Sequence, residues 1–240
     1  MKFTSILKKA LMALTGLALV GFLVSHLLGN LYIYAGSNKF NAYAKLLENN
    51  PQLIIPAEIG LILLFLAHIF LAIKTSSENN AARPVGYDNR RTAGESTLAS
   101  RTMWWSGLVI AIFVVVHVWG FKFGTRPANN SLWELVKNEF QRPGIVAFYV
   151  VSMLFLGLHL SHAIASAFQS LGLLRSSGHP RLGGLGPAIG WGLALGFALL
   201  PIYLFVFKPA PDKVDPLIPH VQSAPTEIRL LTDARIESGK

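Results

Sequence analysis

Five long apolar segments, separated by polar stretches, limit what this chain can fold into. A membrane hydrocarbon core about 30 Å thick needs about 20 helical residues at a rise of 1.5 Å each. The chain is 52% hydrophobic and 14% charged, which is more apolar than a soluble core of 240 residues requires. The segments are free of Asp, Glu, Lys and Arg apart from Glu58, and they span Ala10–Leu31, Leu53–Ile73, Met103–Phe121, Ile145–Phe168 and Leu185–Phe207. We therefore predict an all-α membrane protein, a bundle of five transmembrane helices within residues 1–207, followed by a polar tail over residues 208–240.

The absence of cysteine and the distribution of charge exclude several kinds of site. With no cysteine in the sequence, the chain has no disulfide framework, no thiolate-bound iron–sulfur cluster and no C-x-x-C-H motif for covalent haem attachment. The net charge of +9 lies in short loops between the apolar segments, so we expect membrane lipids and partner subunits as partners, and no nucleic acid. The distribution of Lys and Arg favours a cytoplasmic N-terminus and an outer C-terminus.

Four histidines lie singly in four different apolar segments, each 16 or 17 residues from the end where its segment enters: His26, His68, His117 and His159. Because successive helices run in opposite directions, His26 and His117 are expected near one membrane surface, and His68 and His159 near the other. The two levels would be about 15 Å apart. This arrangement fits two b-type haems, each held by two histidines and by no covalent link.

Other interpretations of the histidines remain open. A histidine inside a membrane helix also serves as an interhelical hydrogen-bonding group or a proton relay. His162 follows His159 by three residues on roughly the same face, so it is either an alternative ligand or a group that supports the ligand. His179 and His220 lie in polar segments, where surface histidines are expected.

A short internal repeat precedes His26 and His117, the pair that a cytoplasmic N-terminus places near the outer surface and that we call the outer pair. His68 and His159 are then the inner pair. Thr-Gly-Leu at 15–17 and Ser-Gly-Leu at 106–108 each precede a histidine, with eleven residues from the hydroxyl residue to His26 or His117. Eleven residues return to nearly the same helix face about 16 Å away. Thr15 and Ser106 are therefore expected at the level of the inner histidine pair, although small residues at these positions also permit close helix packing.

Four stretches of the sequence resemble one family of membrane cytochromes, the dihaem cytochrome b subunits of succinate dehydrogenases and fumarate reductases. They are SHLLGNLYIYAGSNKFNAYAKLL (25–47), ARPVGYDNRRTAGESTLASRTMWWSG (82–107), HVWGF (117–121) and GLHLSHAIASAFQSLG (157–172). The resemblance implies a five-helix anchor in the cytoplasmic membrane, with His26 and His117 on a distal haem and His68 and His159 on a proximal haem. It also implies an iron–sulfur subunit and an FAD-containing flavoprotein as partners, the dicarboxylate site on that flavoprotein, and a quinone, menaquinone in particular, as redox partner. It leaves open the direction of turnover, succinate oxidation or fumarate reduction.

Two positions depart from the family pattern. Glutamates of the fumarate reductase branch correspond here to Asn41 and Gly157, so the quinone site is not carried over from the resemblance. Glu58 is the one acid inside the apolar segments, and we expect it to be a lone carboxyl that desolvation keeps largely protonated. It is the candidate proton acceptor for quinone chemistry, a role in which it is charged only transiently. The alternatives are a purely structural carboxyl, with the quinone near Asn30, Tyr32 and Asn41 or at the inner surface.

Two further function classes remain possible from the sequence. One is the dihaem cytochrome b subunit of another quinone-linked oxidoreductase, a hydrogenase or a formate dehydrogenase. The other is a cofactor-free transporter or scaffold whose histidines only form hydrogen bonds. If the chain is the anchor of a succinate dehydrogenase or fumarate reductase, basic residues of the inner loops are expected to attract an acidic face of the iron–sulfur subunit. They are Arg83, Arg90, Arg91, Arg101, Arg175 and Arg181.

Overall fold

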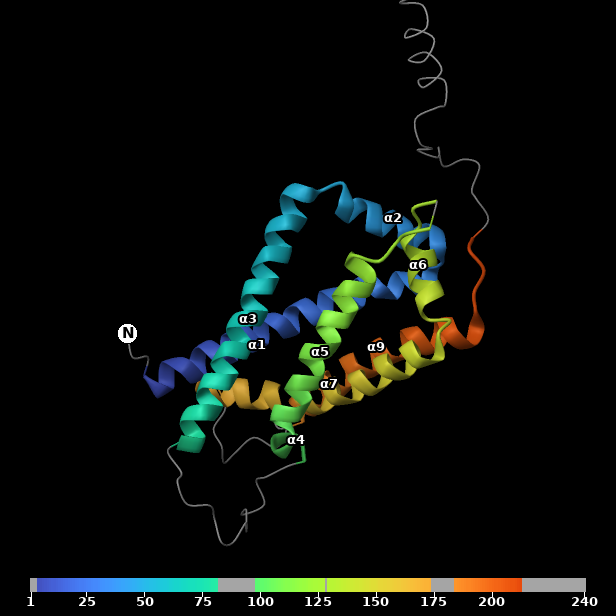
Figure 1. The fold of residues 1–240 in the computed structure, drawn as a ribbon. Coiled ribbons are helices and arrows are strands. Elements are labelled where there is room, and N and C mark those ends of the chain that lie inside the picture. The colour runs from blue at the N-terminus through green and yellow to red at the C-terminus, as the bar shows by residue number, and fades with distance from the viewer. Residues whose placement is uncertain (1–3, 82–97, 128, 174–183, 213–240) are drawn as a thin grey trace, which may run out of the picture.

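Five membrane-length helices make up most of the structure that is described. The computed structural model describes residues 4–81, 98–127, 129–173 and 184–212, and the regular structure within these ranges is helical (Figure 1). Five of the described helices are long and apolar enough to cross a membrane. They are α1 (Ser5–Asn30), α3 (Pro51–Ala81), α5 (Met103–Lys122), α7 (Pro143–Ser170) and α9 (Leu185–Phe207). The prediction of an all-α protein with five membrane helices is confirmed.

The helices extend beyond the apolar segments at several ends. The first begins at Ser5, because the Thr4 side chain accepts a hydrogen bond from the Leu7 amide at 3.3 Å and caps it. Helix α3 continues past the second apolar segment, through a polar stretch, to Ala81. Hydropathy marks only the part of a helix that lies in hydrocarbon, whereas backbone hydrogen bonding continues into the interface.

The helices alternate in direction, which gives the bundle two ends. We call the end where α1, α5 and α9 begin the N side, and the end where α9 finishes the C side (Figure 1). The short helix α4 (Leu98–Arg101) lies at the N side. The C side carries the 3-10 helix η1 (Leu31–Ala35), α2 (Ser37–Glu48) and α6 (Leu132–Glu139).

Helices α7 and α9 lie side by side and make the most extensive contact in the bundle (Figure 1). Glycines on α9 permit this approach. A Cβ on Gly186 would lie 2.7 Å from the Ser161 carbonyl oxygen, and a Cβ on Gly190 would lie 2.7 Å from the Ser161 amide nitrogen. Small residues at such crossings let backbones come close in a membrane, where the hydrophobic effect does not drive association. Gly186 and Gly190 thus serve helix packing, whereas Gly192 has no neighbour within 4 Å of such a Cβ.

A polar and aromatic cap closes the C side. Asn41 of α2 accepts a hydrogen bond from the Trp133 amide and donates one to the Ser131 hydroxyl, both at 3.0 Å, while Ser131 caps α6 through the Glu134 amide. Trp133 is 2% exposed and packs in a buried apolar cluster of this cap. An ion pair between Glu48 and Arg126 joins α2 to the segment before α6.

The chain after α9 returns to the same cap. The Asn38 amide donates to Asp212 at 2.9 Å, and the Asp212 amide donates to the Ser37 hydroxyl at 2.8 Å. The carboxylate thus lies at the N-terminus of α2, where the helix dipole favours negative charge. Gly36 makes the turn into this helix with φ of 100°, a conformation that other residues rarely adopt.

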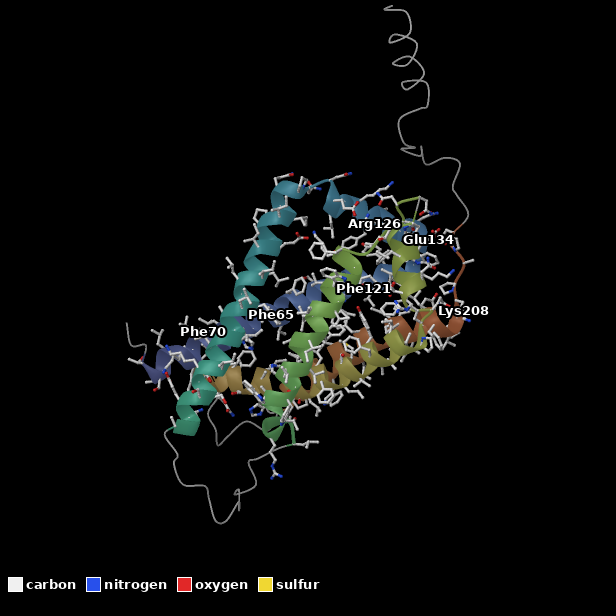
Figure 2. All side chains as sticks on the ribbon, in the orientation of Figure 1. Phe65, Phe70, Phe121, Arg126, Glu134 and Lys208 are labelled. Atoms are coloured by element: carbon white, nitrogen blue, oxygen red, sulfur yellow. The ribbon has the colours of Figure 1, made fainter. Side chains whose placement is uncertain are left out.

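Helix α3 is the least covered of the five membrane-length helices, and α1 and α5 are nearly as exposed. It packs on α1, and none of the residues in its most apolar 18-residue stretch is buried. Figure 2 shows Phe65 and Phe70 on this helix, and Phe70 is 60% exposed. Helix α7, by contrast, has buried residues along most of its length. The flank formed by α3 therefore faces its surroundings, while α7 buries one face against its neighbours.

The close approach of α7 and α9 predicts a position-specific effect of single methyl groups. In Gly190→Ala the new Cβ meets backbone atoms of α7, so the helices must separate, and we expect the folded state to lose about 1 to 3 kcal/mol. The matched control is Gly192→Ala, where the methyl enters open space. Thermal unfolding in detergent, followed by circular dichroism, compares the two. Equal melting temperatures would contradict this account of the α7 and α9 contact.

Candidate functional site

The C-side histidines face each other across the bundle. His26 on α1 and His117 on α5 have ring centroids 5.8 Å apart, with their planes at 85°. Each imidazole also stacks on a phenylalanine one turn earlier in its own helix, His26 on Phe22 at 5.3 Å and His117 on Phe113 at 5.5 Å. The two rings are thus brought together at one level, as their depth in the sequence predicts.

Different groups support the two C-side imidazoles. Nδ1 of His117 lies 3.2 Å from the hydroxyl of Tyr149 on α7, a residue that is 8% exposed and packed among aromatic rings. The Asn30 amide group donates to the His26 carbonyl at 2.8 Å and lies 3.4 Å from His26 Nε2. The second distance is at the long limit for a hydrogen bond, so Nε2 loses only a weak hydrogen bond if it binds another group instead.

The N-side histidines each contact a hydroxyl of a neighbouring helix. Nδ1 of His68 on α3 lies 3.2 Å from the Thr15 hydroxyl on α1. Nδ1 of His159 on α7 lies 3.2 Å from the Ser106 hydroxyl on α5. Thr15 and Ser106 are therefore at the level of the N-side histidines His68 and His159, as the eleven-residue offset predicts.

His159 and His162 are distinguished by their surroundings. His159 lies within electrostatic range of both His68 and His162. The hydroxyl contact from α5, however, is made by His159. This arrangement favours His159 as the partner of His68, with His162 as a neighbour on the same helix. Both residues are partly buried.

A repeat of 91 residues relates the two halves of this site. His117 follows His26 by 91 residues, and His159 follows His68 by the same number. The offset also relates Thr15 to Ser106, Gly16 to Gly107 and Phe22 to Phe113. The structural contacts repeat with it, because each hydroxyl residue and its histidine are 53 residues apart in both halves. The helix pairs α1 with α3 and α5 with α7 are thus two copies of one supporting arrangement.

The repeat identifies a residue that the reading of apolar segments does not single out. Tyr149 lies ten residues before His159, and Glu58 lies ten residues before His68. On α7 this position of the repeat is Tyr149, whose hydroxyl contacts His117 of α5, and on α3 it is the acid Glu58. An alignment of the two halves at an offset of 91 would have drawn attention to Tyr149.

Glu58 is not the lone carboxyl expected from the sequence. It forms an ion pair with Lys122 at the end of α5, and the side chains are 42% and 54% exposed, respectively. Lys122 lies just past the third apolar segment, so hydropathy alone does not associate the two residues. The carboxyl group of Glu58 thus has a basic partner on another helix, whereas the sequence placed it alone in hydrocarbon.

The other positions considered for a quinone have structural partners. Asn41 joins α2 to α6 through its two hydrogen bonds, and Tyr32 stacks on Tyr43 with ring centroids 5.1 Å apart. At Gly157 a Cβ would lie 2.6 Å from the Trp191 ring of α9, so this position has no room for a carboxyl side chain. The two departures from the family glutamates thus coincide with helix-to-helix contacts.

Part of the basic surface expected to bind a partner is described and part is not. Arg101 is exposed at the end of α4, on the N side. His179, His220 and the arginines at 83, 90, 91, 175 and 181 lie outside the described residues. The docking role of these arginines stays a prediction.

The chain is similar to a curated protein, the succinate dehydrogenase cytochrome b558 subunit of Bacillus subtilis (strain 168). The two are 25% identical over 171 residues, which cover 69% of this chain and 79% of that protein. No protein-family model matches the chain, and no solved structure matches it.

The bridging position of Asn41 predicts a local effect on the C-side cap. Asn41→Ala leaves the Trp133 amide without its acceptor, at a cost of about 1 to 3 kcal/mol for an unsatisfied buried group. We expect faster amide hydrogen exchange at the start of α6. The control is Asn50→Ala, because the Asn50 side-chain amide donates within its own turn, to Leu46 O. Unchanged protection of residues 131–136 in Asn41→Ala would show that Asn41 does not hold this helix.

Proposed function

We propose that this chain is the membrane-anchor cytochrome b subunit of a succinate:quinone oxidoreductase. In this proposal two b-type haems connect an iron–sulfur subunit and an FAD-containing flavoprotein to quinone in the cytoplasmic membrane. The observation that carries the proposal is the pair of imidazoles on the C side, repeated by a second, hydroxyl-supported histidine set on the N side. The similarity to a succinate dehydrogenase cytochrome b558 subunit supports the same assignment.

The C-side histidines fit a haem iron. A nitrogen-to-metal distance of about 2 Å on each side of one ion puts two imidazole centroids about 6 Å apart. The ring separation of 5.8 Å between His26 and His117 agrees with that value. Within the described residues no three His, Cys, Asp or Glu side chains gather into a metal site. A haem needs only two protein ligands, because the porphyrin supplies the other four.

Two groups suited to a haem lie about two helical turns beyond the N-side contacts. Thr75 is seven residues after His68, about two turns along the same face of α3, and its hydroxyl is buried without a hydrogen-bond partner. Lys8 is seven residues before Thr15 on α1 and is buried, with Glu78 as its ion-pair partner. A buried ammonium and an unpaired hydroxyl beyond the histidines, toward the N side, are suitable partners for haem carboxylates.

The protein side of electron transfer follows from this arrangement. A bis-histidine haem, when bound, supplies a carrier for one electron at each level. His26 and His117 would hold one iron through Nε2, and His68 and His159 would hold the other. The surrounding helices exclude water, and Thr15, Ser106 and Tyr149 orient three of the four imidazoles.

Quinone chemistry also needs a proton donor or acceptor, and we assign that role to Glu58. Since the position equivalent to Glu58 in the repeat, Tyr149, contacts His117, Glu58 belongs to the level of the C-side histidines. Its partner Lys122 supplies a positive charge that favours binding of a quinone oxygen bearing developing negative charge. Both side chains are accessible from the flank formed by α3 and α5.

Partner binding is assigned to the N side. In the proposed orientation the N-terminus and the basic loops face the cytoplasm, where the soluble subunits dock. Arg101, exposed at the end of α4, would then belong to the docking surface. Menaquinone is the proposed quinone.

Haem content tests the function directly. Because there are two histidine levels, pyridine haemochrome analysis of the purified complex should return close to two haems per chain. His159→Ala should remove one of them, since that iron loses a ligand, whereas His162→Ala should keep both. The complex should also reduce quinone with succinate as donor. A wild-type chain without haem, or one that transfers electrons only from hydrogen or formate, would contradict the proposal.

Glu58→Gln tests the proton role separately from haem binding. The amide keeps the size of the side chain but neither carries the charge nor accepts a proton. We expect succinate-driven quinone reduction to fall about 10²-fold, the lower end of what a positioned acid or base contributes, while both haems stay bound. Glu48→Gln is the matched control, because Glu48 is also an ion-paired acid of the C side. Equal turnover in the two variants would leave Glu58 with a structural role.

A further inference from the structure

The hydroxyls of Thr15 and Ser106 each have only one proton to donate. Thr15 Oγ1 donates to backbone carbonyl oxygens one turn earlier, those of Leu11 at 2.9 Å and Met12 at 3.0 Å. Ser106 Oγ donates in the same way to the Met103 carbonyl at 3.1 Å. Such bonds to the preceding turn are the usual arrangement of Ser and Thr inside helices, where they satisfy the hydroxyl locally.

This use of the proton fixes the direction of the contact with each histidine. Because the hydroxyl hydrogen is already engaged, the oxygen has only lone pairs to offer to the imidazole. Nδ1 of His68 and Nδ1 of His159 then carry the proton and direct it toward the hydroxyl oxygen at 3.2 Å, beside the backbone carbonyl of Met12 or Met103 on the same neighbouring helix. In a neutral imidazole the other nitrogen, Nε2, is left with a free lone pair, the form that binds a metal.

The glycine after each hydroxyl residue gives the ring its place. A Cβ on Gly16 would lie 3.2 Å from Cε1 of His68, and a Cβ on Gly107 would lie 3.6 Å from Cε1 of His159. Since Cε1 lies between the two ring nitrogens, the glycines let the imidazole edge rest against the neighbouring helix. Each N-side imidazole is therefore held at Nδ1 and lies close beside a backbone at Cε1.

We propose that Thr15 and Ser106 are positioning residues that set the tautomer, and thereby the ligand strength, of His68 and His159. This inference rests on the proposed function and deepens it, because it assigns tuning of one particular haem to two hydroxyls. A hydrogen bond from Nδ1–H makes an imidazole a stronger electron donor and stabilises the oxidised iron. The C-side haem has no such hydroxyl pair, since His117 contacts the Tyr149 phenol and His26 contacts Asn30. The two haems thus receive different support from one repeated scaffold.

The experiment uses the complete membrane complex with Thr15→Val, Ser106→Ala and the double variant. Valine keeps the shape of threonine and removes its hydroxyl. Thr15→Ser restores a hydroxyl and should restore the wild-type behaviour. Ser152→Ala is the matched control, because Ser152 is a buried serine of α7 whose hydroxyl donates to the Phe148 carbonyl at 2.7 Å. Haem content, the midpoint potential of each haem and the low-spin ferric EPR spectrum are measured for every variant.

We expect all variants to keep two haems. The midpoint potential of the haem on His68 and His159 should rise in each single variant and rise further in the double variant. The potential of the other haem should stay at its wild-type value in these variants. In Thr15→Ser and Ser152→Ala both haems should have wild-type potentials. The EPR signal of the same haem should shift, because the imidazole planes lose their anchor. Potentials and EPR spectra that do not change in the double variant would overturn this inference while leaving two haems in place. A wild-type complex with no haem would instead overturn the proposed function.

Discussion

Hydrocarbon offers no hydrogen-bonding partner, so a polar side chain inside a membrane helix has to be satisfied by the chain itself or by a ligand. Several hydroxyl groups of the membrane helices follow this constraint. Hydroxyls such as Thr15, Ser106 and Ser152 bond to the preceding turn of their own helix, and two of them also accept from a histidine on the next helix. Those contacts join α1 to α3 and α5 to α7 at defined depths. The relative positions of the helices and the placement of the imidazoles therefore have a common cause.

The five helices and the two histidine levels could be predicted because they depend on the identity and spacing of residues along single helices. Hydropathy gives the segments, and a rise of 1.5 Å per residue converts the positions of His26 and His68 into depth. Contacts between residues distant in sequence could not be predicted in this way. The pairing of Glu58 with Lys122, the Tyr149 contact with His117 and the use of Asn41 as a bridge all depend on how the helices pack. The resemblance to a known family did not supply them either, because the chain departs from the pattern of that family at Asn41 and Gly157.

The 91-residue repeat separates what the scaffold needs from what each half does. Hydroxyl, glycine, phenylalanine and histidine occur in both halves, and these are the residues that hold and orient imidazoles. The position ten residues before the N-side histidine differs, with an exposed acid on α3 and a buried tyrosine on α7. The physical reason is coverage, because α7 lies against α9 and α3 does not share that burial. A carboxylate on the covered helix would lack water and a lysine partner, whereas a tyrosine needs only one hydrogen bond.

The position of α9 also gives the bundle a direction within the plane of the membrane. Four helices related by a repeat would present two equivalent flanks to a molecule diffusing in the bilayer. By packing along α7 through Gly186 and Gly190, the fifth helix shields one flank and leaves the other, with Glu58 and Lys122, open to the lipid. In the proposed function, lateral approach of a quinone to the C-side histidines would thereby be confined to one side of the protein. Neighbouring copies or subunits that cover α3 would regulate that approach without contacting a single histidine.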